Sequence, residues 1–123
     1  MLAVEEADVR VLVVDDERLV LRAVERALRV SGFEVTTAAT FEAALEAVET
    51  IAFDVALVDR QLGLRNGLRL VEDLRRRAPT TEMVIMSGEQ LDEEGELPFL
   101  RKPFTPSDLL RVLTQLRSRG DHG

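Results

Sequence analysis

The stretch Val11-Leu-Val-Val-Asp-Asp16 decides the fold, because a short apolar run stops abruptly at two carboxylates. The same arrangement recurs at Val55-Ala-Leu-Val-Asp59, and Met83-Val-Ile-Met86 runs into Ser87-Gly88. Short continuous apolar runs bounded by polar residues are typical of buried parallel strands. In an open parallel sheet, ligands bind just beyond the carboxyl ends of the strands. The pattern therefore predicts a sheet with a polar site along one edge.

Segments with helical periodicity alternate with the strand-like runs. Glu34-Val-Thr-Thr-Ala38 and 97–100 read as two further strands, and Thr40 and Thr105 can cap the helices that follow them. The predicted helices carry apolar stripes at Leu19, Val20, Ala23, Ala27, Leu28 and Val30, then Phe41, Ala44, Leu45 and Val48, then Leu68, Leu70, Val71 and Leu74, and finally Leu109, Leu110, Val112, Leu113 and Leu116. This alternation predicts a doubly wound α/β fold: a five-stranded parallel sheet with helices on both faces.

The fourth helix is the exception to this alternation. The segment Leu91-Asp-Glu-Glu-Gly-Glu-Leu-Pro98 has no apolar period and contains Gly95 and Pro98, so we expect this helix to be short or absent. No repeat, linker or second domain is visible. The prediction is a single domain over 1–123, with its core at about 9–117 and tails at 1–8 and 118–123.

Composition excludes several classes of function. The net charge of −7 argues against a general surface for nucleic acid or a lipid bilayer. The chain has no cysteine, which excludes disulfides, thiolate metal sites and a cysteine nucleophile. No apolar stretch approaches the length of a membrane span, and the N-terminus does not resemble a signal peptide. We therefore expect a cytoplasmic protein.

The carboxylates at the strand ends are the strongest chemical signal. Asp15 and Asp16 follow the first strand and Asp59 follows the third, and these strands can be neighbours in a doubly wound sheet. Three close carboxylates repel one another, and a hard divalent cation such as Mg²⁺ relieves that repulsion. Lys102 adds a second positive charge, and Ser87 adds a hydroxyl. A carboxylate beside a metal and a lysine suits phosphoryl transfer.

Each of these residues also has a structural interpretation when it is taken alone. Asp15-Asp16-Glu17 can cap a helix, Asp59 can be a turn residue, and lysine is common at strand ends. Taken together they all fall at the ligand-binding edge of the predicted sheet. That coincidence favours a functional site over a purely structural explanation.

The ordered set Asp15-Asp16, Asp59, Ser87 and Lys102-Pro103 on five alternating units resembles the receiver domain of two-component response regulators. The resemblance runs from Val9 to about Arg117. It implies the flavodoxin-like strand order 2-1-3-4-5 and makes Asp59 the phospho-acceptor.

The same resemblance implies a role for each of the other site residues. Asp16, Asp59 and the backbone carbonyl of Gln61 would bind Mg²⁺, and Asp15 would help through water. Ser87 and Lys102 would hold the phosphoryl group. Ser87 and Phe99 would form a switch, in which the serine moves toward the phosphate and the ring turns inward.

The implied function is signalling. A histidine kinase or a histidine phosphotransfer protein would phosphorylate Asp59 in a phosphorelay, and the changed surface would engage a downstream protein, with no nucleic-acid or membrane partner. The domain would be no enzyme beyond catalysing its own phosphorylation and dephosphorylation. The interval from Ser87 to Lys102 is about two helical turns shorter than the family pattern. Such a shortened segment resembles that of receivers that are attached to histidine kinases or serve them.

Two other functions stay open on sequence alone. One is a receiver-like module that binds partners without being phosphorylated. The other is a phosphatase that forms an aspartyl-phosphate at Asp59. Haloacid-dehalogenase-type phosphatases place a general acid two positions after the nucleophile, where this chain has Gln61.

Overall fold

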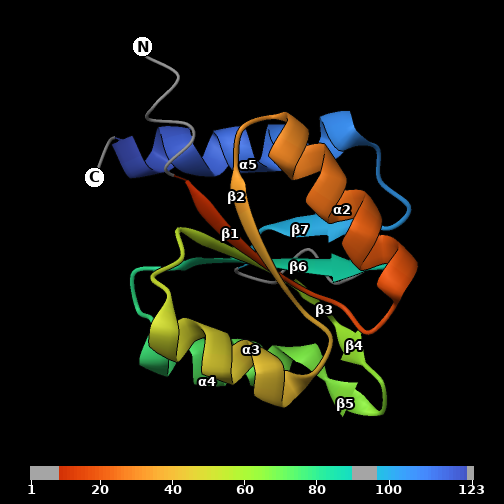
Figure 1. Cartoon of the computed structure of the whole chain (residues 1–123), viewed down its shortest axis with the longest axis vertical. Helices are drawn as coiled ribbons and strands as arrows, with labels where there is room; N and C mark the ends of the chain where they lie inside the picture. Colours follow the sequence, from red (N-terminus) through yellow and green to blue (C-terminus); the bar gives the residue numbers. More distant parts are fainter. Residues whose placement is uncertain (1–8, 90–96, 122–123) are drawn as a thin grey trace.

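A five-stranded parallel sheet forms the centre of the computed structural model, which describes residues 9–89 and 97–121 (Figure 1). The order across the sheet is β2-β1-β3-β6-β7. These strands are β1 (Arg10–Val14), β2 (Glu34–Ala38), β3 (Val55–Asp59), β6 (Glu82–Ser87) and β7 (Phe99–Arg101). Counted along the chain they give the predicted order 2-1-3-4-5, which is confirmed.

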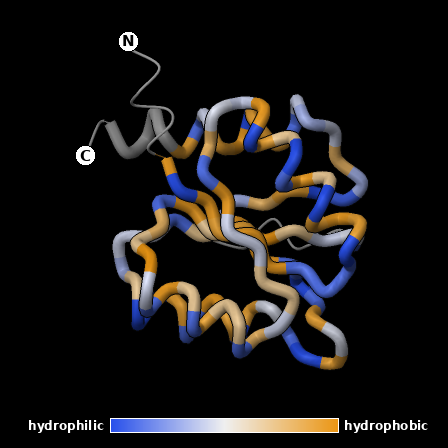
Figure 2. Tube along the Cα trace, in the orientation of Figure 1, coloured by the Kyte–Doolittle hydropathy of each residue, from blue (hydrophilic) through white to orange (hydrophobic). Residues whose placement is uncertain are grey.

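In the part of the chain that the structure describes, two helices cover each face of the sheet (Figure 1). Helices α2 (Arg18–Val30) and α5 (Pro106–Asp121) pack on one face, and α3 (Phe41–Thr50) and α4 (Gly67–Arg77) on the other. Alternate residues of β1 supply the two cores, because successive side chains of a strand point to opposite faces. Val13 joins the core under α2 and α5, and Val14 joins the core under α3 and α4. In Figure 2 the central strands are predominantly hydrophobic.

The two threonines that the sequence predicts as helix caps form capping hydrogen bonds in the structure. The Thr40 hydroxyl accepts a hydrogen bond of 3.0 Å from the Ala43 N–H. At α5 the capping is reciprocal: Thr105 N–H donates to the Asp108 carboxylate at 3.0 Å, and Asp108 N–H donates to the Thr105 hydroxyl at 3.1 Å. Such a capping box satisfies two backbone donors that the helix itself leaves unpaired.

The apolar stripe predicted for the first helix is partly wrong. Leu19 and Val30 are 80% and 81% exposed, whereas Leu21, Val24 and Leu28 are buried. At about 100° per residue, Leu19 and Val30 fall on nearly the same side of the helix and roughly opposite Leu28. The three- and four-residue spacings of this helix therefore describe two separate apolar faces, and only one of them reaches the sheet.

Two further differences concern loops and ends. The loop after β3 contains a small antiparallel hairpin, β4 (Gln61–Leu62) and β5 (Arg65–Asn66), which the sequence did not indicate. Gly63 turns this hairpin with a positive φ of 60°. Helix α5 continues to Asp121, into the segment predicted as a tail, because no proline interrupts it and one glycine costs a helix only about 1 kcal/mol. The predicted core at about 9–117 stays a prediction.

The prediction for the fourth helix concerns residues 90–96, which lie outside the described residues. Among the helices of residues 9–89 and 97–121, none combines the length and apolar character needed to cross a membrane.

Candidate functional site

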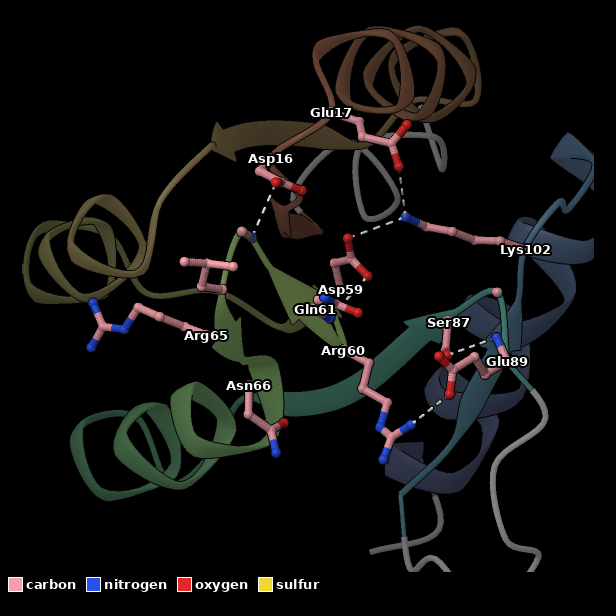
Figure 3. A pocket seen from close by; sticks show the side chains of 13 residues that line it. Asp16, Glu17, Asp59, Arg60, Gln61, Arg65, Asn66, Ser87, Glu89 and Lys102 are labelled. Atoms are coloured by element: carbon pink, nitrogen blue, oxygen red, sulfur yellow. Dashed lines mark hydrogen bonds and ion pairs between the residues drawn. The ribbon is translucent and has the colours of Figure 1, made fainter.

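An open cleft of about 660 Å³ lies at the carboxyl ends of β1, β3, β6 and β7 (Figure 3). Of the polar site residues singled out in the sequence, all but Asp15 line this cleft, and Asp15 is buried beside it in contact with Lys102. Parallel strands bring these ends to one edge, and the loops that follow them form the walls. The residues that line the cleft are Asp16, Glu17, Asp59, Arg60, Gln61, Gly63, Leu64, Arg65, Asn66, Ser87, Gly88, Glu89 and Lys102.

Asp59 is the last residue of β3 and lies at the centre of the cleft. Its side chain is 10% exposed. One oxygen, Oδ2, lies 3.3 Å from Lys102 Nζ, and the other, Oδ1, accepts a hydrogen bond of 3.3 Å from Gln61 N–H. Burial, together with the negative charge of Asp15, raises the pKa of Asp59 to about 6, although the Gln61 N–H and Lys102 both act to lower it. Loss of solvation thus outweighs the favourable contacts.

Lys102 is bound more tightly to Asp15 than to Asp59. Its Nζ lies 2.6 Å from Asp15 Oδ2, and Asp15 is completely buried. Asp15 Oδ1 accepts a further hydrogen bond of 2.9 Å from Glu17 N–H. Burial by itself lowers the pKa of Lys102, but the hydrogen bond and charge of Asp15, together with Asp59, outweigh burial and raise it. Its Nζ also lies 3.9 Å from Glu17 Oε1, so Lys102 is a fixed cation that faces three carboxylates.

Three carboxylates could hold a cation at this edge. Asp15, Asp16 and Asp59 each place one oxygen within 4.8 Å of the others. Asp16 is exposed, and its Oδ2 accepts a hydrogen bond of 3.0 Å from Gly63 N–H, so the hairpin turn holds it over the cleft (Figure 3). Oxygen donors of this kind match the ligand preference of Mg²⁺. Burial is the main cause of the raised pKa of Asp59, and the charge of Asp15 adds a repulsion that a divalent cation would relieve, so the donor set fits such an ion.

The two predicted switch residues lie on neighbouring strands. Ser87 ends β6 and is buried, and its hydroxyl accepts a hydrogen bond of 3.1 Å from Glu89 N–H. Phe99 begins β7, where it pairs in register with Ile85 and packs, partly buried, against the core under α3 and α4. The structure thus places Ser87 at the cleft, and it places Phe99 on β7, next to β6, which carries Ser87.

Sequence reasoning did not assign a role to Gly67, which begins α4 and packs against the backbone of Asp59. A Cβ atom at Gly67 would lie 1.9 Å from the backbone oxygen of Asp59. The Gly67 N–H donates to the backbone oxygen of Arg60 at 2.6 Å. Only glycine allows the start of α4 to approach the acceptor strand this closely. The signal in the sequence is the Asn66-Gly67 pair, a turn-forming dipeptide in the loop after Asp59.

The match that decides the family covers most of the chain. The family model described as the response regulator receiver domain matches residues 11–114. The chain belongs to this family. Receiver domains are signalling modules of two-component systems, so the predicted family and class of function are confirmed.

Curated proteins similar to this receiver domain are bacterial regulators. The transcriptional regulatory protein PrrA of Mycobacterium tuberculosis is 36% identical over 90% of this chain, and 51% of PrrA is covered. The alginate biosynthesis transcriptional regulatory protein AlgB of Pseudomonas aeruginosa is 31% identical over 89% of this chain, and 26% of AlgB is covered. The receiver domain thus spans about half, or less, of the length of these relatives.

Solved structures agree on the fold. A CheY-like receiver domain protein from Methanospirillum hungatei matches with a TM-score of 0.83 at 28% identity, covering 94% of this receiver domain and 98% of that protein. The chemotaxis protein CheY4 of Vibrio cholerae matches with a TM-score of 0.82 at 29% identity, covering 88% and 98%.

Proposed function

We propose that this receiver domain accepts a phosphoryl group on Asp59 from a histidine kinase or a histidine phosphotransfer protein, and that phosphorylation changes a surface read by a downstream protein. The observation that carries the proposal is the arrangement around Asp59. Its buried carboxylate lies 3.3 Å from Lys102 and is grouped with Asp15 and Asp16.

In the proposed reaction an Asp59 oxygen forms a bond to phosphorus while the bond from phosphorus to the donor breaks. The leaving group, a histidine nitrogen or the carboxylate oxygen of acetate, departs with the bonding electron pair. Burial of Asp59 removes solvent from the attacking oxygen. Lys102 is a preorganised cation for the phosphoryl oxygens, and such fixed charges stabilise the transition state of phosphoryl transfer. The Ser87 hydroxyl is a further hydrogen-bond donor for a phosphoryl oxygen.

Asp16, Asp59 and the backbone carbonyl of Gln61 would hold Mg²⁺, with Asp15 acting through water. Both Asp15 oxygens already accept hydrogen bonds, from Glu17 and Lys102, which supports an indirect role. When bound, Mg²⁺ supplies positive charge that neutralises the carboxylates and the phosphoryl group.

The proposed switch follows from the contacts of Ser87. If the Ser87 hydroxyl turns to the phosphoryl group, it breaks the hydrogen bond that it now accepts from the Glu89 N–H. Movement at the end of β6 would reach Phe99, which pairs with the same strand two residues earlier. A new charge with three acceptor oxygens can bias such a packing change.

The relatives bear on the downstream target, because PrrA and AlgB are named as transcriptional regulators. We therefore narrow the prediction of no nucleic-acid partner to the receiver surface itself, whose net charge of −7 opposes contact with a phosphate backbone. A protein that contains this receiver can act on transcription through other surfaces. The proposed location is the cytoplasm.

Intact-protein mass spectrometry after incubation with Mg²⁺ and acetyl phosphate tests the proposal. We expect one added phosphoryl group in the wild type, none without Mg²⁺, and none in the Asp59→Asn variant. An adduct that persists in Asp59→Asn would contradict the assignment of the acceptor.

If no adduct forms and no Mg²⁺ binding is detected, the domain is a module that binds partners without phosphorylation. Turnover of an unrelated phosphomonoester would instead support the phosphatase alternative. Bound Mg²⁺ without an adduct calls for the same measurement with a histidine kinase as donor.

A further inference from the structure

An ion pair bridges the rim of the cleft between two strand ends (Figure 3). Arg60 Nη1 lies 3.4 Å from Glu89 Oε2, although the two residues are 29 positions apart in the chain. Arg60 directly follows Asp59, and its N–H donates to the backbone oxygen of Met86 at 2.8 Å. The backbone pairing of β3 with β6 therefore sets these two side chains opposite each other.

The backbone of Glu89 is anchored beside the proposed phosphoryl site. Its N–H donates to the Ser87 hydroxyl, the group that we propose binds a phosphoryl oxygen. The Glu89 carboxylate therefore adds a negative charge where an anionic phosphodonor must enter. Like charges at this range repel each other, and the repulsion is stronger beside a low-dielectric wall than in bulk water.

The other cations that line the cleft are already engaged. Lys102 pairs with Asp15, Asp59 and Glu17, and Arg65 pairs with Glu42 at 2.5 Å. The lining carboxylates are Asp16, Glu17, Asp59 and Glu89. Within the described residues, the one ion pair formed by Glu89 is with Arg60.

We propose that Arg60 is a positioning residue that neutralises Glu89 and keeps its carboxylate at the rim, so that an anionic phosphodonor can approach Asp59. This inference rests on the proposed function. Without Arg60, the unpaired carboxylate is free to swing toward Ser87 and raises the barrier to phosphorylation. The opposing interpretation is an ordinary surface ion pair, because the side chains are 38% and 75% exposed and such pairs contribute little to stability.

The test is the initial rate of Asp59 phosphorylation by acetyl phosphate at saturating Mg²⁺ and low ionic strength, followed by intact mass. We expect Arg60→Ala to react about three- to tenfold more slowly than the wild type. Arg60→Lys, which keeps the charge, retains most of the rate. Glu89→Gln alone is at least as fast as the wild type, and the double variant Arg60→Ala/Glu89→Gln recovers most of the loss. About 0.5 M NaCl shrinks the difference by screening.

Equal rates for Arg60→Ala and the wild type at low salt would overturn the inference, and so would a double variant as slow as Arg60→Ala, since Arg60 would then act on the donor directly. The proposed function is tested separately, because it fails if the wild type takes up no phosphoryl group or if Asp59→Asn still takes one up. Unchanged Mg²⁺ affinity and thermal unfolding in Arg60→Ala show that a slower rate does not come from a damaged fold.

Discussion

Gly67 shows how one residue of the fold protects the geometry of the acceptor. We expect Gly67→Ala to lower the free energy of unfolding by about 2–4 kcal/mol, because its Cβ would meet the backbone oxygen of Asp59 at 1.9 Å and the backbone must shift. Urea unfolding measures this cost. Phosphorylation of Asp59 should slow in the same variant, because the acceptor is displaced.

Gly88 is the matched control for that substitution. A Cβ at Gly88 meets nothing within 4 Å, so Gly88→Ala should change the unfolding free energy by less than about 0.5 kcal/mol. If the two alanine variants were equally stable, the close approach of α4 to the acceptor strand would be wrong.

Among the elements, α2 offers a comparison of two leucines in one helix. Leu28 is completely buried and Leu19 is 80% exposed. Leu28→Ala should therefore cost about 2–5 kcal/mol through lost transfer energy and a cavity, while Leu19→Ala stays within about 0.5 kcal/mol of the wild type. Urea unfolding of both variants checks this, and a similar cost at the two positions would show that Leu19 is packed.

The elements also show what a sequence can and cannot predict. Capping is local, so the start of α5 at Thr105-Pro106 and its partner Asp108 could be predicted from adjacent residues. The parallel sheet followed from the alternation of strands and helices, and its strand order from the family resemblance. The exposure of Leu19 could not be predicted, because spacing alone does not say which of two apolar faces meets the sheet.

The site, too, has features that the sequence could predict and features that it could not. Strand ends identified Asp15, Asp16, Asp59, Ser87 and Lys102, because parallel topology brings all such ends to one edge. The sequence did not show that Lys102 binds Asp15 more closely than Asp59, or that Gly67 touches the acceptor strand, since both depend on distances between elements far apart in the chain. The binding of Mg²⁺ by the Gln61 carbonyl and the movement of Phe99 stay predictions.

For the whole molecule, the charge state of Asp59 links pH to stability. Its pKa is raised from 3.8 to about 6 on folding, so without metal the folded state holds more protons than the unfolded chain between these values. Stability from this group is therefore present below about pH 4 and is lost as pH rises to about 6. The unfolding free energy of Asp59→Asn relative to the wild type, in EDTA, should rise by about 2 kcal/mol over this window.

The proposed Mg²⁺ site reverses this trend, since a cation binds the ionised carboxylates of the folded chain. At pH 7, Mg²⁺ at a hundred times its Kd should raise the unfolding free energy by about 2.7 kcal/mol. Because a proton on Asp59 competes with the cation, Mg²⁺ affinity measured by calorimetry should fall about tenfold from about pH 7 to about pH 5. An affinity that does not change over this range would mean that Asp59 is not a ligand, and would leave Asp15 and Asp16 to hold the ion without the acceptor.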